Sequence, residues 1–154
     1  MRKLLLALAS VLLANAMNAQ NLFYEDFESM TRIQGNCYHL PDGWTTISDN
    51  YTNNSNYSSW GASWVGYNFS TGKAAASCTY TAERSQVDRW LISPAIIMPQ
   101  SGSINLRFMV RGSDYGELMR VMVSSTGRSK TDFVELQDYR LVTDDWVEKV
   151  ANLS

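Results

Sequence analysis

The feature that most constrains the fold is the segment Ile104–Val110, in which apolar and polar side chains alternate. Its apolar positions are Ile104, Leu106, Phe108 and Val110. Successive side chains of a β-strand point to opposite faces, so this period of two predicts a strand with one face in a core and the other mostly in water. Such a strand is typical of a sandwich of antiparallel sheets.

A second extended segment, Val87–Pro94, lies shortly before it. In this segment Trp90 and Ile92 fall on one face, and Arg89 and Leu91 on the other. Pro94 has no backbone N–H to donate, so the ladder is expected to end there.

Several other segments have the composition of short strands. They are Asn21–Ser29, Trp44–Ile47, Lys73–Tyr80, Glu117–Ser124, Phe133–Leu136, Arg140–Val142 and Trp146–Val150. Lys73–Tyr80 is rich in Ala, which also favours a helix, but its β-prone end and the preceding Gly72 favour a strand. No long helical period is present in the chain after its first residues, so the predicted class is an all-β sandwich.

The first residues have the pattern of a secretory signal peptide. Arg2 and Lys3 precede an apolar run, Leu4–Ala14, that is too short to span a bilayer. We expect cleavage after Ala19, which removes residues 1–19 and leaves residues 20–154 as one domain. The alternative is an uncleaved membrane anchor. We therefore predict a secreted or cell-surface protein with no membrane insertion after cleavage.

Charge limits the classes of partner. The mature chain has 11 basic and 15 acidic residues, a formal charge of −4. Nucleic acids and anionic membrane surfaces select basic proteins, so neither is an expected partner.

The chain has two cysteines, Cys37 and Cys78, which in an exported protein are candidates for a disulfide. Unpaired buried cysteines are the alternative. The single histidine, His39, leaves too few ligands for a zinc site and no convincing base for a catalytic nucleophile. No catalytic constellation is visible, so we do not expect an enzyme.

The segment Glu25–Glu28 concentrates carboxylates near the start of the mature chain. Asp26 and Glu28 offer the oxygen ligands that a hard cation such as Ca²⁺ prefers. The alternative is an acidic, solvated strand edge that discourages pairing with other chains.

An aromatic set follows a polar region rich in Asn, Ser and Tyr: Tyr57, Trp60, Trp64 and Tyr67. Aromatic rings on a loop form good contact surfaces for sugars or proteins, because they bury a large area at little entropic cost. The alternative is that at least one of the two Trp side chains belongs to the core. These four residues are the predicted ligand-binding set.

Several motifs together resemble a known family. They are Glu25–Glu28, Leu40-Pro41-Asp42-Gly43-Trp44, Trp60, Asp88–Pro94, Leu106-Arg107-Phe108, Val121–Gly127 and Trp146. In this order they are similar to the cleaved adhesin, or choice-of-anchor J, domains. These are jelly-roll modules of secreted and surface proteins of Bacteroidetes, including the haemagglutinin-adhesin regions of gingipains, and they are MAM-like in fold.

The resemblance implies a jelly-roll of two antiparallel sheets and a structural Ca²⁺ site to which Asp26 and Glu28 contribute. Asp49 stands where the family often has an Asp-rich loop, so it is a third expected ligand. The family usually continues past the strand beginning at Trp146, so we expect a domain lacking its final strands and a site lacking some ligands. Further domains of a longer polypeptide are then possible partners.

The function implied by the resemblance is a non-catalytic adhesion module that recognises a host surface protein or glycan. The alternative is a structural accessory domain of a larger secreted peptidase or other surface enzyme.

Overall fold

The protein is described here by a computed structural model that covers residues 21–49, 63–77, 88–113 and 116–153. Within these residues the chain is all-β, its strands pair in antiparallel ladders, and helical structure is confined to one short 3₁₀ turn. The prediction of an all-β sandwich is therefore confirmed. None of the described helical residues form a segment long and apolar enough to cross a membrane.

The strands have the following bounds: β1 (Arg32–Gln34), β2 (Cys37–Tyr38), β3 (Thr45–Asp49), β4 (Val65–Phe69), β5 (Gly72–Ala76), β6 (Asp88–Ile92), β7 (Asn105–Val110), β8 (Glu117–Val123), β9 (Val134–Leu141) and β10 (Val147–Asn152). The 3₁₀ turn η2 (Lys130–Asp132) lies between β8 and β9.

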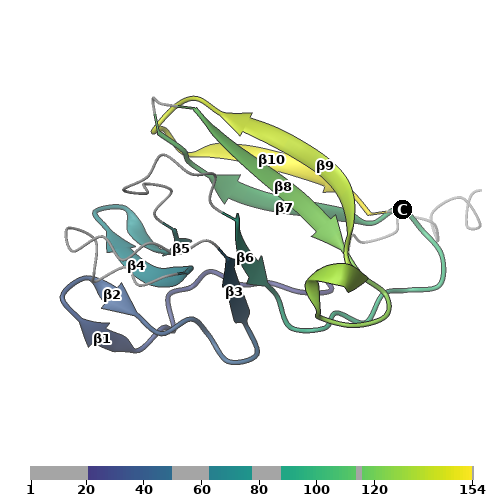
Figure 1. Ribbon diagram of the computed structural model, residues 1–154, viewed down its shortest axis with the longest axis horizontal. Helices are drawn as coiled ribbons and strands as arrows, with labels where there is room; N and C mark the ends of the chain where they lie inside the picture. The colour runs from purple at the N-terminus through teal and green to yellow at the C-terminus, as the bar shows by residue number, and fades with distance from the viewer. Residues whose placement is uncertain (1–20, 50–62, 78–87, 114–115, 154) are drawn as a thin grey trace, which may run out of the picture.

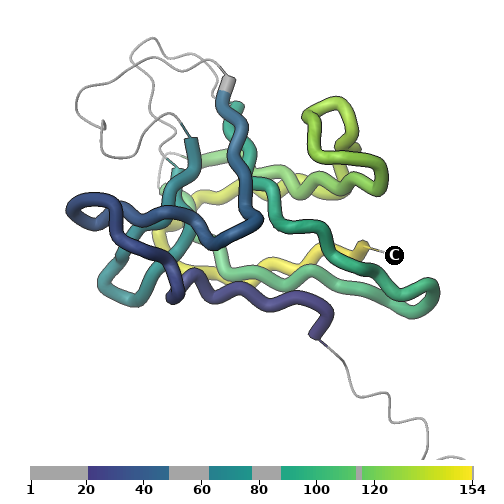
Figure 2. The backbone as a smooth tube through the Cα atoms, turned by 90° about the horizontal axis from the view of Figure 1, so that it is seen from below, coloured from purple at the N-terminus to yellow at the C-terminus, as the bar shows by residue number. Residues whose placement is uncertain are grey.

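The strands form one four-stranded sheet, in the order β1-β2-β4-β5, and the two-stranded ladders β3–β6, β7–β10 and β8–β9. In Figure 1 the four-stranded sheet occupies one half of the molecule and β7 to β10 the other, with β3 and β6 between them. Figure 2 shows β10, in yellow, near the middle of the molecule beside β7.

Tyr139 of β9 contacts both strands of the β7–β10 ladder. The ring of Tyr139 in β9 packs edge-to-face on Phe108 in β7, with 5.7 Å between the ring centroids. Its hydroxyl donates a hydrogen bond of 2.9 Å to the backbone carbonyl of Val150 in β10. Tyr139 thus joins the two ladders by both an apolar and a polar contact.

The strongly alternating strands follow the sequence prediction. Along β7 the side chains alternate between exposed and half-buried. Strand β6 ends at Ile92, two residues before Pro94, and the alanine-rich segment is a strand, β5, rather than a helix.

One prediction of strand number was wrong. Phe133–Leu136 and Arg140–Val142 were expected to be separate strands, but β9 spans both. The polar residues between them stay in the strand because β9 is largely exposed to solvent, and a register shift opposite Val121 and Met122 accommodates them.

The prediction of a first strand over Asn21–Ser29 was also wrong, since no ladder forms there. The carboxylates bind the local backbone instead. Glu25 Oε1 accepts the N–H of Phe27 at 2.7 Å, and Asp26 Oδ1 accepts the N–H of Glu28 at 3.0 Å. Phe27 has a φ of 61°, which turns the chain out of an extended path.

The core consists of small and medium-sized residues. The buried hydrophobic residues among those described are Met30, Cys37, Ala76, Ile92, Val121, Leu141 and Ala151. Larger aromatic side chains surround them and stay partly accessible. Trp44 packs on Phe23 and Phe27 with centroid distances of 6.1 Å and 5.2 Å.

Candidate ligand-binding surface

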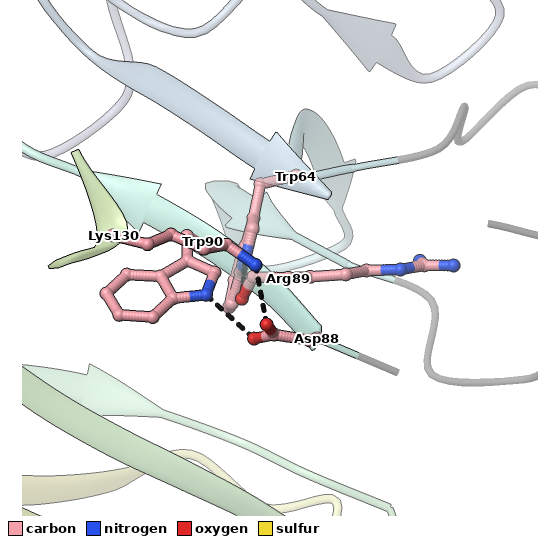
Figure 3. Close-up of polar contacts among 5 residues, drawn as sticks. All are labelled: Trp64, Asp88, Arg89, Trp90 and Lys130. Atoms are coloured by element: carbon pink, nitrogen blue, oxygen red, sulfur yellow. Dashed lines mark hydrogen bonds and ion pairs between the residues drawn. The ribbon is translucent and has the colours of Figure 1, made fainter. Parts of the chain in front are cut away.

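The predicted aromatic set is only partly described, because Tyr57 and Trp60 lie outside the described residues. Trp64 immediately precedes β4 and is half-buried. Its indole N–H donates a hydrogen bond of 3.1 Å to the backbone carbonyl of Arg89 in β6. Trp64 therefore ties β6 to the start of β4 (Figure 3).

Tyr67 was expected on a loop, but it lies within β4 and is half-buried. Its ring packs edge-to-face on Phe69, with 4.9 Å between centroids, and Phe69 packs in the same way on Trp146 at 5.8 Å. This aromatic row connects the four-stranded sheet with the start of β10. The signal missed in the sequence is the alternation of Val65, Tyr67 and Phe69, which has a strand period.

The ends of two undescribed segments lie close together in the fold. Residues 50–62 connect Asp49 with Ser63, and residues 78–87 connect Ser77 with Asp88. Asp49 and Asp88 are cross-strand partners at one end of the β3–β6 ladder. Ser77 accepts a hydrogen bond of 3.4 Å from Nη1 of Arg89, the residue after Asp88. We call Asp49, Ser63, Ser77 and Asp88 the anchor residues, because both segments leave the described fold through them.

On one face of the β3–β6 ladder, Asp88 is fully engaged. Its Oδ1 accepts the indole N–H of Trp90 at 2.7 Å, and its Oδ2 forms an ion pair of 2.5 Å with Nζ of Lys130 (Figure 3). The Lys130 ammonium lies 5.5 Å from the centroid of the Trp90 ring, a cation–π distance. Trp90 also packs on Phe133 at 5.5 Å. This face therefore holds the connection between β8 and β9.

Several buried polar atoms have no hydrogen-bond partner among the described residues. Three of them lie at the anchor residues or next to them: Arg89 Nε, Ser48 Oγ and Ser63 Oγ. A buried polar group without a partner costs about 1–3 kcal/mol, so such groups are rare and call for an explanation. In the sequence, Arg89 was noted only for lying on the face opposite Trp90; an arginine inside a half-buried strand was the signal that could have drawn attention to it.

The acidic set forms two separate groups. Glu28 Oε1 accepts the backbone N–H of Lys73 at 2.8 Å, while Lys73 Nζ donates to the carbonyl of Glu28 at 2.7 Å. Lys73 lies near the start of β5, whereas Ser77, just past its other end, lies beside Arg89. Four residues of a strand span about 13 Å. Asp26 and Glu28 therefore lie together near the start of β5. Asp49 is an anchor residue and lies near the other end of that strand.

The structure shows how far these acidic residues suit a cation. Asp26 and Glu28 each give one oxygen to a backbone N–H, and each keeps a second carboxylate oxygen. No three acidic, histidine or cysteine side chains of the described residues gather as a metal site. Ca²⁺ takes six to eight oxygen ligands, so these two carboxylates would supply only part of a coordination shell. The Ca²⁺ site stays a prediction.

Of the predicted disulfide pair, only Cys37 lies within the described residues. It is buried in β2, with 4% of its surface exposed, and its cross-strand partner in β4 is Tyr67. Cys78 lies outside the described residues, as does the predicted signal peptide of residues 1–19. Both predictions therefore stay open.

Comparison with known proteins connects this architecture with one family. No curated protein and no solved structure matches the chain. Residues 24–150, which include every strand from β1 to β9 and most of β10, match the Cleaved Adhesin Domain family. The motif order that resembled this family is therefore confirmed, and an adhesion-type module with an extracellular or surface location is indicated. The chain belongs to the Cleaved Adhesin Domain family.

Proposed function

We propose that this protein is an exported, non-catalytic binding module that attaches to a host surface protein or glycan. The observation that carries the proposal is the family match over residues 24–150. Export follows from the predicted signal peptide, and the negative charge of the mature chain is consistent with a partner that is neither nucleic acid nor an anionic membrane.

The anchor residues support a contact surface at one end of the β3–β6 ladder. The two segments that leave there contain Tyr57 and Trp60 together with many Asn, Ser and Thr residues. These residue types combine rigid aromatic area with adaptable hydrogen bonding, as in other surfaces that recognise varied partners. Strands β3 and β6 hold the ends of both segments in register through five residue pairs.

A structural accessory role within a larger secreted enzyme is the second candidate. The internal contacts of Trp64 and Tyr67 favour it, since both side chains hold strands together. Under this alternative the aromatic set stabilises the domain and contacts no external ligand.

The two candidates are separated by binding measurements on purified mature protein, using a glycan array and immobilised host surface proteins. We expect the wild type to bind, and Trp60→Ala to weaken binding at least about tenfold while the melting temperature stays unchanged, because aromatic residues dominate contact energies. Trp60→Phe, which keeps an aromatic ring, should retain most of the affinity.

Trp64→Ala serves as the comparison. Because it removes the hydrogen bond to Arg89, we expect a lower melting temperature, with binding per folded molecule reduced less than in Trp60→Ala. A folded wild type that binds nothing on either array would refute the binding module and favour the accessory role.

A further inference from the structure

Strand β9 has an open edge within the described part of the chain. It pairs with β8 on one side, and no other described strand pairs with it. In an antiparallel strand paired on one side only, alternate residues direct their backbone N–H and C=O groups outward. None of these groups in β9 bonds another described backbone group. Figure 1 shows β9 along the upper margin of the molecule, where its edge can receive a further strand.

The regular part of β9 is short and has a defined centre. The register against β8 shifts between Gln137 and Glu135, which leaves Leu136 as an extra residue. From Gln137 to Leu141 the pairing with β8 is continuous, and Tyr139 is the middle residue of that stretch. A strand added to the edge would therefore pair most regularly along Gln137–Leu141.

Asp138 and Arg140 are both exposed and lie on one face of β9. Their cross-strand partners in β8 are Arg120 and Leu118, and Arg120 forms its ion pair with Glu135. Neither Asp138 nor Arg140 forms an ion pair or a side-chain hydrogen bond with the described residues. The edge therefore carries one negative and one positive charge, two residues apart, without partners in the described fold.

We propose that the β9 edge pairs with β9 of a second copy of this chain, in an antiparallel two-fold dimer centred on Tyr139. A two-fold axis perpendicular to the sheet keeps corresponding faces of the two copies on the same side. Centring on Tyr139 places Asp138 opposite Arg140 of the second copy, and Arg140 opposite the Asp138 of the second copy. Each charge then has opposite charges as its neighbours. This self-association goes beyond the proposed binding function and does not depend on it.

Charge complementarity favours a second copy as the occupant. Self-pairing of this kind needs opposite charges two residues apart on one face, and the other described strands lack them. Glu148 and Lys149 of β10 are adjacent, so they lie on opposite faces. In β7 the one charged residue, Arg107, already pairs with Glu148. The edge of β5 is covered by Glu28.

Exposed apolar side chains lie on either side of the charged centre. Val142 is 59% exposed and Leu136 is 37% exposed. In the proposed register Val142 of one copy comes next to Leu136 of the other, so pairing removes apolar surface from water at both ends. Because an edge contact is smaller than a standard protein interface, we expect the dimer to dissociate on dilution.

The test is sedimentation velocity of the mature protein from about 10 µM to about 1 mM, since small interfaces are weak. We expect a concentration-dependent shift from monomer to dimer. Arg140→Glu surrounds the centre with negative charges and should weaken dimerisation at least about tenfold, because like charges directly opposite each other are unfavourable. Arg32→Glu on β1 changes the net charge by the same amount and should leave dimerisation unchanged.

Exchanging the two charges gives a sharper test. The double variant Asp138→Arg with Arg140→Asp restores opposite charges across the pair without changing the net charge. Its dimerisation should recover to within about threefold of the wild type. Near-UV circular dichroism checks that each variant is folded. A folded double variant that stays monomeric, or equal dimerisation of Arg140→Glu and Arg32→Glu, would overturn the proposed pairing.

Hydrogen exchange of the wild type tests the proposal without any variant. In the dimer the outward amides of β9 become bonded, so exchange within residues 137–141 should be slower at high than at low protein concentration. A dimer that leaves these amides unprotected uses another surface and overturns the proposal. A wild type that stays monomeric throughout excludes a second copy as the occupant and leaves the edge to a strand of another protein.

Discussion

At some positions of this chain, close contact with a neighbouring side chain limits the residue type as much as burial does. Gly66 in β4 is buried, and a Cβ atom added to it would overlap the sulfur of Met30 and lie 3.0 Å from the Cβ of Tyr38. Met30 is itself 5% exposed. The missing side chain of Gly66 thus makes room for Met30, which joins the N-terminal turn to the four-stranded sheet.

We therefore expect Gly66→Ala to lower the free energy of unfolding by about 1–3 kcal/mol, the usual cost of overpacking. Chemical denaturation monitored by tryptophan fluorescence measures it. Met30→Ala also destabilises, by about 2–5 kcal/mol, because it leaves a cavity. In the double variant the new methyl group no longer meets the Met30 side chain, so the combined cost should be clearly less than the sum. Additive costs would contradict the proposed contact.

Strands were predictable from the sequence where one face is buried and the other exposed, because apolar and polar residues then alternate. β7, and β8 over its first half, alternate between more and less exposed positions, so their pattern is visible in the sequence. β1 was missed because all of its residues are exposed, which removes the alternation. The turn after Glu25 was missed because carboxylate-to-backbone bonds replaced a ladder. The unpaired Nε of Arg89 was missed because hydrogen-bond partners are visible only in three dimensions.

Glu28 illustrates how an element's edge is protected. Asn68 donates its N–H to Asn36 on the β2 side, so its cross-strand partner Lys73 points its own N–H away from β4. Glu28 accepts that N–H, and so covers the outer edge of β5. The same carboxylate is a predicted Ca²⁺ ligand. Covering the strand edge requires only an oxygen that accepts a hydrogen bond, whereas binding Ca²⁺ favours a charged oxygen.

Glu28→Gln separates these roles. The amide oxygen can still accept the N–H of Lys73, so without Ca²⁺ we expect a melting temperature close to that of the wild type. Ca²⁺ should raise the melting temperature of the wild type, because a ligand that binds only the folded state stabilises it. The increase should be smaller in Glu28→Gln, since a neutral amide is a weaker ligand for a hard cation.

The matched control is Glu148→Gln, which also removes one exposed negative charge but lies on β10 in an ion pair with Arg107. Its response to Ca²⁺ should equal that of the wild type. The predicted cation site is excluded if Ca²⁺ leaves the wild-type melting temperature unchanged, and Glu28 is excluded as a ligand if all three proteins respond equally.

The molecule as a whole is held together by a few contacts between ladders rather than by one large core. The connection between β8 and β9, residues 124–133, packs on the β3–β6 ladder through Lys130 and Phe133. The connection is itself ordered by short-range hydrogen bonds. Ser124 Oγ accepts the N–H of Gly127, and Asp132 Oδ2 accepts the N–H of Ser129. The connection therefore loses little further conformational entropy when its side chains pack on β3 and β6.

Arg128 is the most connected residue of that contact. Its Nη2 lies 2.7 Å from the carbonyl of Gly43, 3.0 Å from Thr45 Oγ1 and 2.9 Å from the carbonyl of Ser93. These acceptors lie in or next to both strands of the β3–β6 ladder, at the end opposite the anchor residues. We expect Arg128→Ala to lower the free energy of unfolding by about 1 kcal/mol, since charged hydrogen bonds at an exposed site keep part of their strength.

For a domain of this size that loss corresponds to a fall of roughly 4 °C in melting temperature, measurable by differential scanning calorimetry. Arg128→Lys should retain part of this stability, because Nη2 alone makes these contacts and an ammonium is also a single nitrogen with three donors. Arg107→Ala, which breaks an exposed ion pair of 3.5 Å with Glu148, should change stability by less. If Arg128→Ala and Arg107→Ala have equal effects, the hydrogen bonds of Arg128 add no more stability than an exposed ion pair, which contradicts this prediction.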